Sequence, residues 1–297
     1  MQTVYANDNS KLACDWYERW HGHRPECCDV RDVQRLPASD YVCAGFPCVA
    51  FSRAGLQRGT KDRRGTQLFD ETVRLLRTSP PRIGVVLENV PRLLTWDNGS
   101  AHRHVCASLE ALGFLVHYRV LNAADYGLPQ QRKRLLYVAV RPGHAFDWPA
   151  PVPLEQRLVL EDVLEPEDEP KCIARTDITC GPPRYPSLTS PPPRQPRPIQ
   201  MGFIGTNRQG QRIYHRRGAA PTLTCWTPIR VYEDQDRVRI TRPREMARLQ
   251  GVPEWLPVPK SEQAANSLMG NAVAAHVVAH VAQRLALGRP VTAGDRQ

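Results

Sequence analysis

The chain has 297 residues, of which 40 are basic and 30 acidic, so its formal net charge is +10. This length fits one large or two modest domains with a sizeable core. Hydrophobic residues at 41% and charged residues at 24% exclude a disordered or membrane-embedded chain. The positive charge favours a polyanionic partner. Arginine outnumbers lysine, which suits phosphate and base recognition but also follows from codon bias in a GC-rich genome.

Neither end of the chain carries a targeting signal that we recognise. The first residues lack the basic and apolar regions of a signal peptide, and the longest uncharged run, 264–283, holds too many polar residues to span a membrane. The nine cysteines contain no CxxC pair. His276 and His280 lack an intervening glutamate and are read as helix-surface histidines. We therefore expect a cytoplasmic protein with reduced thiols and no metal site.

Residues 1–145 alternate between strand-like and helix-like runs. The strand-like runs are Thr3–Ala6, Tyr41–Ala44, Ile83–Leu87 and Leu135–Val140. The helix-like runs are Lys11–Trp20, Leu68–Thr78 and His102–Leu112, the last followed by Gly113 as a C-cap. The alternation predicts an α/β fold with a parallel sheet and helices on both faces.

The rest of the chain predicts two further parts. Proline is concentrated between residues 142 and 200, which favours a linker followed by a small irregular domain, together covering 146–235. Residues 236–297 turn helical again, over Arg244–Gln250 and along a stripe from Ala274 to Leu285, and are expected to return to the first domain.

Cys48 is the sharpest candidate for chemistry. It lies in residues 44–52, AGFPCVAFS, directly after a predicted strand. Loops at the carboxyl ends of strands carry the sites of α/β folds, and glycine and proline fix such a turn. A cysteine there can act as a nucleophile if its thiolate is stabilised, although a single cysteine is more often a small buried residue.

Two further segments carry charged side chains at the same kind of position. Residues 85–91, VVLENVP, deliver Glu88 at the end of an apolar strand, where desolvation would raise its pKa and suit it to act as an acid. Residues 126–134, YGLPQQRKR, place Arg132 and Arg134 on one face of an extended segment, as a phosphate or a planar base requires. A solvated carboxylate and a basic strand edge are the plainer readings.

These segments, together with 241–253, TRPREMARLQGVP, and 269–273, MGNAV, resemble the C5-cytosine DNA methyltransferases in the family's own order. The resemblance covers nearly the whole chain. It implies a Rossmann-like, class I S-adenosylmethionine-dependent methyltransferase sheet with a small target-recognition domain. It also implies the chemistry: Cys48 adds to C6 of a flipped-out cytosine, Glu88 bonds or protonates N3, Arg134 holds the base, and Arg132 holds nearby backbone or the thiolate.

The resemblance also assigns binding residues. S-adenosylmethionine is the implied cofactor, with these cofactor-binding residues: Asp8, Asn9, Asp29, Val30, Pro47, Asn271 and Ala272. Duplex DNA is the implied partner, with these DNA-binding residues: Ser52, Gln209, Gln211, Arg212, Thr222 and Trp226. Ordinary loop polarity is the competing reading for the target-region residues. The implied enzyme is a monomer that works with or without a cognate restriction endonuclease.

The family's usual first strand and its glycine-rich turn, Phe-x-Gly-x-Gly, are not found before Thr3–Ala6. In this fold that strand lies at the sheet centre, so two edges are expected to be unpaired. A misassigned start, which an upstream extension would reveal, is the preferred explanation over a true truncation or a second polypeptide. The alternative functions are a catalytically inactive remnant that at most binds DNA, and a tRNA cytosine-5 methyltransferase.

Overall fold

The computed structural model describes residues 1–46, 64–166, 173–174, 178–180, 192–232 and 237–288. The chain divides into two compact units. The first consists of residues 1–121, 133–149 and 281–297, and the second of 122–132 and 150–280. In this division residues 236–280 belong to the second unit, whereas the sequence led us to expect 236–297 to return to the first domain.

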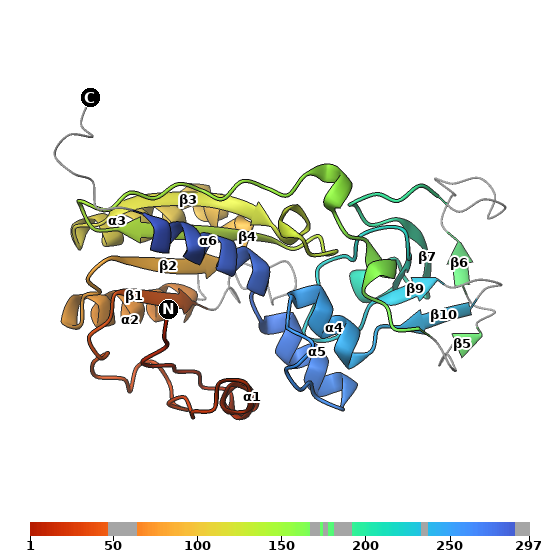
Figure 1. Ribbon diagram of the computed structural model, residues 1–297, viewed down its shortest axis with the longest axis horizontal. Coiled ribbons are helices and arrows are strands. Elements are labelled where there is room, and N and C mark those ends of the chain that lie inside the picture. The colour runs from red at the N-terminus through yellow and green to blue at the C-terminus, as the bar shows by residue number, and fades with distance from the viewer. Residues whose placement is uncertain (47–63, 167–172, 175–177, 181–191, 233–236, 289–297) are drawn as a thin grey trace. The chain divides into compact units, whose positions relative to one another are not determined.

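A four-stranded sheet forms the centre of the first unit (Figure 1). Its strands in spatial order are β1 (Tyr41–Gly45), β2 (Gly84–Asn89), β4 (Lys133–Val140) and β3 (Leu115–Asn122). β1 and β2 are parallel, whereas β2 and β4 are antiparallel. The expectation of an all-parallel sheet is therefore wrong. The sheet is mixed because of β3, a strand that the sequence analysis did not predict. The connection from β3 to β4 is too short for a parallel crossover.

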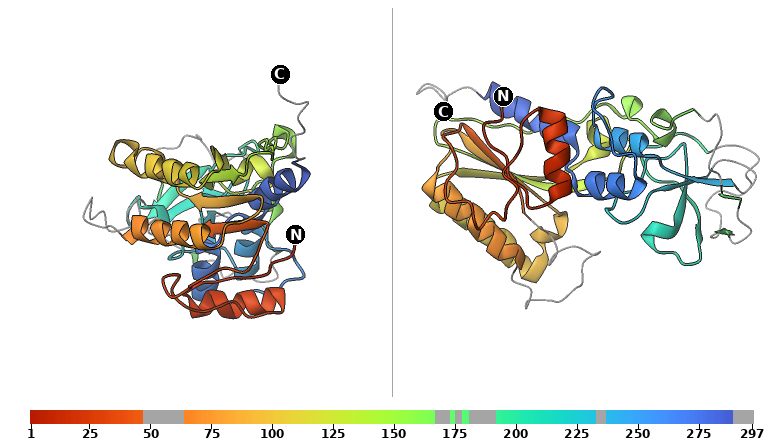
Figure 2. Two further views of the ribbon diagram at one scale, coloured as in Figure 1. Left: turned by 90° about the vertical axis from the view of Figure 1, so that its left-hand side faces the viewer. Right: turned by 90° about the horizontal axis from the view of Figure 1, so that it is seen from below.

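Helices cover both faces of this sheet. α2 (Arg64–Thr78) and α3 (Ser100–Ala111) lie on one face, and the C-terminal part of α6 (Ala275–Leu287) lies on the other (Figure 2). The Tyr41 hydroxyl donates to the Leu285 carbonyl and ties α6 to the start of β1. α1 (Lys11–His21) begins at its N-cap Ser10 and ends at Gly22, whose φ of 74° suits glycine.

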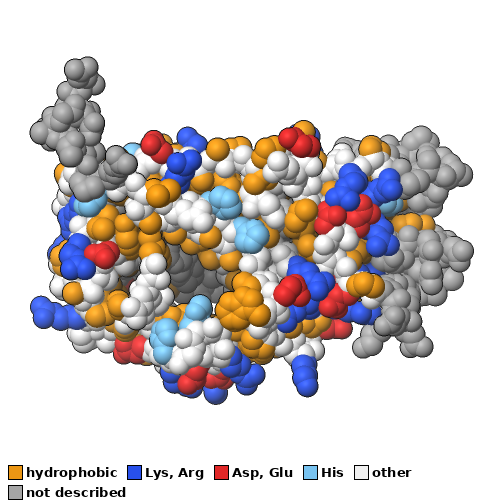
Figure 3. All heavy atoms as spheres, viewed as in Figure 1, with side chains coloured by type: hydrophobic (Ala, Val, Ile, Leu, Met, Phe, Trp, Pro, Cys, Tyr) orange, Lys and Arg blue, Asp and Glu red, His pale blue; other side chains and the backbone are white. Residues whose placement is uncertain are grey.

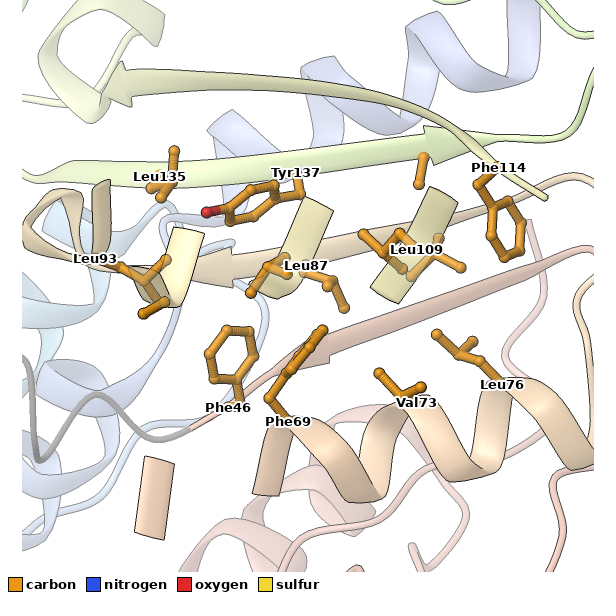
Figure 4. Close-up of a cluster of buried hydrophobic side chains, with 14 residues drawn as sticks. Phe46, Phe69, Val73, Leu76, Leu87, Leu93, Leu109, Phe114, Leu135 and Tyr137 are labelled. Carbon is orange, nitrogen blue, oxygen red and sulfur yellow. The ribbon is translucent and has the colours of Figure 1, made fainter. Parts of the chain in front are cut away.

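The core of the first unit fills the space between the sheet and helices α2 and α3. Phe69, on α2, contacts Phe46 with ring centroids 5.3 Å apart, and Leu87 and Tyr137 descend from β2 and β4 onto them (Figure 4). Alternate residues of each strand point into this cluster, as the pleat requires. This packing fixes the carboxyl ends of β1 and β2, where the candidate catalytic residues were predicted.

Residues 3–6 form no strand, so the expected strand Thr3–Ala6 is wrong. Their neighbourhood holds only an isolated bridge between Asn7 and Glu26. β-branched residues favour an extended backbone, but a strand also needs a neighbouring ladder. Within the described residues, β1 pairs on one side only, with β2. Its other edge faces residues 1–8 across a groove.

The second unit is built around a six-stranded sheet rather than irregular structure. Its strands in spatial order are β5 (Ile173–Ala174), β10 (Arg237–Ile240), β9 (Arg230–Tyr232), β8 (Arg212–His215), β7 (Gln200–Ile204) and β6 (Ile178–Cys180). Within the described residues, the β8–β9 pair is parallel and the other neighbouring pairs are antiparallel. The composition of this region did not predict the sheet, because the strands are short and the region is rich in proline. The unit also holds α4 (Pro243–Gln250) and α5 (Glu262–Asn271).

Candidate functional site

Glu88 and Arg134 form an ion pair at one end of the first unit's sheet. The Arg134 Nε lies 2.7 Å from the Glu88 Oε1, and both side chains are about four-fifths buried, with exposed fractions of 18% and 19%. Glu88 is the penultimate residue of β2 and pairs in register with Gly45 of β1. The structure thus brings together two of the four predicted catalytic residues.

The next residue, Asn89, fixes the chain where it leaves β1. Its buried side chain donates from Nδ2 to the Phe46 carbonyl over 3.1 Å and accepts from the Val90 amide over 2.8 Å. Phe46 is itself buried against Phe69. Position 46 is therefore held firmly beside Glu88. Three predicted site residues follow it directly in sequence, and these lie outside the described residues: Pro47, Cys48 and Ser52.

A groove of about 710 Å³ runs along the outer edge of β1. Its lining includes four predicted cofactor residues, namely Asp8, Asn9, Asp29 and Val30. Its volume lies within the range of small-molecule sites. Carboxylates beside an apolar strand suit the hydroxyl and amine groups of a nucleoside, so the lining fits the cofactor that the sequence implies.

The groove's two carboxylates that were predicted to bind the cofactor, Asp8 and Asp29, are held differently. The Asp8 Oδ1 accepts the Ser10 amide over 2.8 Å, which starts α1. Asp29 is gripped by its neighbour Arg31, whose Nε and Nη2 donate to the two carboxylate oxygens over 2.9 and 2.7 Å. These hydrogen bonds lower the pKa of Asp29 to about 2. Asp29 is therefore an acceptor only, across the ordinary pH range.

Side chains that the sequence reading passed over support this groove. Asn7 donates from Nδ2 to the Glu26 and Cys28 carbonyls, which fixes residues 5–8 against 26–28. Arg74 of α2 donates to the Val33 carbonyl over 2.7 Å and holds the turn that carries Val30. Both are ordinary polar residues in the sequence, and only their long-range contacts reveal what they position.

Arg132 takes a different place from Arg134, so the expectation that the two share one face toward a single anion is wrong. The Arg132 amide donates to the Gln130 carbonyl in a tight turn before β4, so strand alternation does not reach it. Its guanidinium is buried in the second unit. There it donates to the carbonyls of Leu223 (3.1 Å), Gly270 (3.0 Å) and Ala272 (2.7 Å). Contact with nearby backbone was predicted; contact with the thiolate remains a prediction.

Asn271 and Ala272, the remaining predicted cofactor residues, lie at the C-terminal end of α5. The Ala272 amide closes that helix by donating to the Leu268 carbonyl. Asn271 is exposed and Ala272 is half-buried. The sequence reading placed these residues in a loop and did not find α5, although Ser261 is a favourable N-cap and caps the Ala264 amide.

The predicted DNA-contacting residues that are described gather around the 3-10 turn before β8. Gln209 donates to the Thr222 carbonyl over 3.1 Å, and Gln211 accepts from the Thr206 amide over 3.1 Å. Arg212 donates to the Asn207 side chain over 2.9 Å. Trp226 is 79% exposed, an unusual position for so large an apolar side chain. Gln209 and Trp226 are exposed, whereas Gln211, Arg212 and Thr222 are half-buried.

No described helix is both long enough and apolar enough to cross a membrane. Among the described residues, no group of three or more His, Cys, Asp or Glu side chains is arranged to hold a metal ion. The His280 Nδ1 donates to the His276 carbonyl over 2.7 Å within α6.

Comparison with known proteins gives one consistent answer. Residues 1–286 match the family of C-5 cytosine-specific DNA methylases. The type II methyltransferase M.HhaI of Haemophilus parahaemolyticus is 33% identical over 96% of this chain and 87% of its own length. M.NlaX of Neisseria lactamica is 30% identical over 96% and 88%.

Solved structures agree at the level of the fold. The methyltransferase Dnmt2 of S. pombe superimposes with a TM-score of 0.69 at 16% identity, covering 96% of this chain and 90% of that one. The E. coli "putative DNA modification methyltransferase encoded within prophage" gives a TM-score of 0.65 at 17% identity, covering 96% of this chain and 93% of that one. With the family match extending over nearly the whole sequence, the chain belongs to the C-5 cytosine-specific DNA methylase family.

Proposed function

We propose that this protein transfers a methyl group from S-adenosylmethionine to C5 of a cytosine that has been flipped out of duplex DNA. The observation that carries the proposal is the Glu88–Arg134 pair, 2.7 Å apart at the sheet end beside the segment that leads to Cys48. A carboxyl group and a guanidinium suit the N3 and O2 edge of cytosine. Membership of the family supports the same reading.

In the proposed reaction, the Cys48 thiolate forms a bond to C6 of the base, and the displaced electrons of the C5–C6 double bond make C5 nucleophilic. Glu88 hydrogen-bonds or protonates N3, and Arg134 holds the ring so that the negative charge is stabilised. When bound, S-adenosylmethionine supplies the electrophilic methyl group. Loss of the C5 proton to a base and breakage of the sulfur–C6 bond then regenerate the thiolate and yield 5-methylcytosine.

The proposal assigns binding roles as well. Asp8, Asn9, Asp29 and Val30 line the groove for the cofactor's nucleoside, and Asn271 and Ala272 serve its methionine end. Gln209, Gln211, Arg212, Thr222 and Trp226 contact DNA, with Arg212 reading a guanine. Double-stranded DNA is the partner, the monomer is the working form and the cytoplasm is the compartment, with or without a cognate endonuclease.

The test is transfer of labelled methyl groups to duplex DNA, with 5-methylcytosine identified in the digested product. The 297-residue chain is assayed beside an upstream-extended form, because the outer edge of β1 has no pairing partner among the described residues. Cys48→Ala is expected to abolish transfer in whichever form is active. Cys106→Ala, at a half-buried cysteine of α3, is the matched control and should leave transfer intact.

Each alternative has its own outcome. Methyl transfer to tRNA transcripts but not to DNA would favour the tRNA enzyme. Salt-sensitive DNA binding without cofactor binding or transfer, in both forms, would favour the inactive remnant and overturn the proposal.

A further inference from the structure

The C-terminal end of α5 is capped by side chains from outside the helix. The last carbonyls of a helix have no amide partner within it. Here the Met269 and Ala272 carbonyls accept from the Gln250 Nε2, the latter over 3.4 Å. The Gly270 and Ala272 carbonyls accept from the Arg132 Nη2 over 3.0 and 2.7 Å. Ala272 therefore receives both donors at one oxygen.

Both donors are buried. Gln250 is 1% exposed and Arg132 is 2% exposed, so water does not compete for these carbonyls. A guanidinium beside the negative end of the α5 dipole is favourable in sign. Buried polar groups held in this way have one geometry rather than several. The turn after α5 is thus specified by side chains rather than by local backbone preference.

A second glutamine sets the orientation of the Gln250 amide. Gln130 is fully buried and donates from Nε2 to the Leu249 carbonyl over 2.7 Å and to the Gln250 Oε1 over 3.4 Å. The Gln130 Oε1 in turn accepts the Leu223 amide over 3.0 Å. Because the Gln250 oxygen accepts from Gln130, its NH₂ group is left to face α5.

Close backbone contact adds a steric constraint. A Cβ atom on Gly270 would overlap the Thr224 carbonyl carbon and the Cys225 amide. The end of α5 therefore lies directly against the segment 223–225. Arg132 donates hydrogen bonds to both sides of this contact, at the Leu223 and Gly270 carbonyls. Movement of either segment disturbs the other.

From this geometry we propose that Gln250 is a positioning residue that, together with Arg132, fixes the Asn271–Ala272 turn in the orientation needed to bind the cofactor. Gln250 touches neither cofactor nor base in this proposal; it acts through the carbonyls of residues 269–272. The inference rests on the proposed function for its cofactor, but the arrangement of the turn is testable without it.

The experiment compares Gln250→Glu and Gln250→Leu with the unsubstituted full-length chain. Both remove the NH₂ donor, and the glutamate also places a repelling oxygen opposite the Ala272 carbonyl. Hydrogen exchange measured by mass spectrometry is expected to accelerate about tenfold over residues 270–275, the loss typical of one buried hydrogen bond. The dissociation constant of S-adenosylmethionine is expected to rise by about the same factor, with kcat at saturating cofactor little changed.

Thr241→Val is the matched control, because the fully buried Thr241 hydroxyl accepts the Ile229 amide and makes no contact with α5. It should lower stability without changing exchange at 270–275 or cofactor affinity. If either Gln250 variant does not fold, Gly270→Ala takes its place. The added methyl group pushes the end of α5 away from residues 224–225, and it should likewise speed exchange at 270–275 and weaken cofactor binding.

Three results would overturn the inference. The first two are unchanged exchange at 270–275 in folded Gln250 variants, and faster exchange there with unchanged cofactor affinity. A fall in kcat with an unchanged cofactor constant would also overturn it, since that pattern belongs to a group acting on the reacting atoms. If the unsubstituted protein, in either form, binds no cofactor, the proposed function fails instead, and the exchange comparison alone decides whether Gln250 fixes the turn.

Discussion

At the scale of single residues, the Asp29–Arg31 pair is open to direct titration. Arg31 holds the pKa of Asp29 at about 2, and Arg31→Ala should return it toward the ordinary aspartate range. Because the pKa is lowered on folding, the ionised carboxylate stabilises the fold above the ordinary range and that contribution is lost as the pH falls toward 2. Carboxyl-carbon NMR measures the shift. Glu254, whose lowered pKa depends on Arg248, should not move.

Glu88 gives the sharpest activity prediction. Glu88→Gln keeps the shape and a hydrogen-bond acceptor beside Arg134 but removes the acid, so methyl transfer should fall by at least about 100-fold. The measurement is single-turnover transfer at saturating DNA and cofactor. Glu254→Gln alters a carboxylate that also pairs with arginine, Arg248, at 2.7 Å, and should leave the rate unchanged. Equal rates for Glu88→Gln and the unsubstituted protein would remove Glu88 from the chemistry.

At the scale of elements, α4 depends on one buried carboxylate. Glu245 is fully buried. It accepts from Arg239 over 2.6 Å, from the Glu165 amide, and from the Arg242 amide at the helix N-terminus. Glu245→Ala leaves the buried Arg239 without this partner and should destabilise the protein by about 3–5 kcal/mol. Glu254→Ala, at an exposed pair, should cost less than about 1 kcal/mol. Urea unfolding of both variants measures the difference.

The elements also show what sequence patterns can and cannot predict. Three predicted strands and all of the predicted helices are confirmed, with ends shifted by at most four residues, because buried apolar runs and capping residues are local signals. Leu115–Asn122 contains two valines and a tyrosine, residue types favoured in strands, and could have been found as β3. Thr3–Ala6 has the residue types of a strand but forms no ladder with a neighbouring strand. The sequence of one segment does not show whether such a partner is present.

The candidate site divides in the same way. Glu88 and Arg134 were predictable because strand ends meet at one edge of a sheet, and the structure pairs them. Gln130, Gln250 and Asn89 were not, since each acts through contacts with distant backbone that a single sequence does not reveal. Arg132 was correctly singled out as important. Its carbonyl partners lie 91 to 140 positions away along the chain.

At the scale of the whole molecule, the net charge of +10 predicts salt-sensitive DNA binding. If about six phosphates are neutralised, affinity should fall on the order of 1,000-fold between about 50 and 200 mM salt. Fluorescence anisotropy with a labelled duplex gives the slope of log K against log salt. A flat dependence would mean that the positive charge does not contact the DNA backbone.

The charge is not spread as one uniform patch. On the face drawn in Figure 3, basic and acidic side chains are interleaved over the second unit. There Arg194 pairs with Glu161 and Asp162, and Arg248 pairs with Glu254. Paired arginines attract phosphate weakly, so we expect fewer counterions to be released than the net charge alone suggests.

Among the described residues no strand pairs with the outer edge of β1, and this has a consequence for handling the protein. A sheet whose edge presents a free row of amides and carbonyls can recruit a strand from a second copy, and partly unfolded chains then assemble rather than refold. Cys43 lies on this edge, accessible to solvent but enclosed enough that burial raises the pKa of its thiol. Slowed alkylation of Cys43 as protein concentration rises would report such assembly. We expect assembly through this edge to shorten the protein's storage life before it affects catalysis.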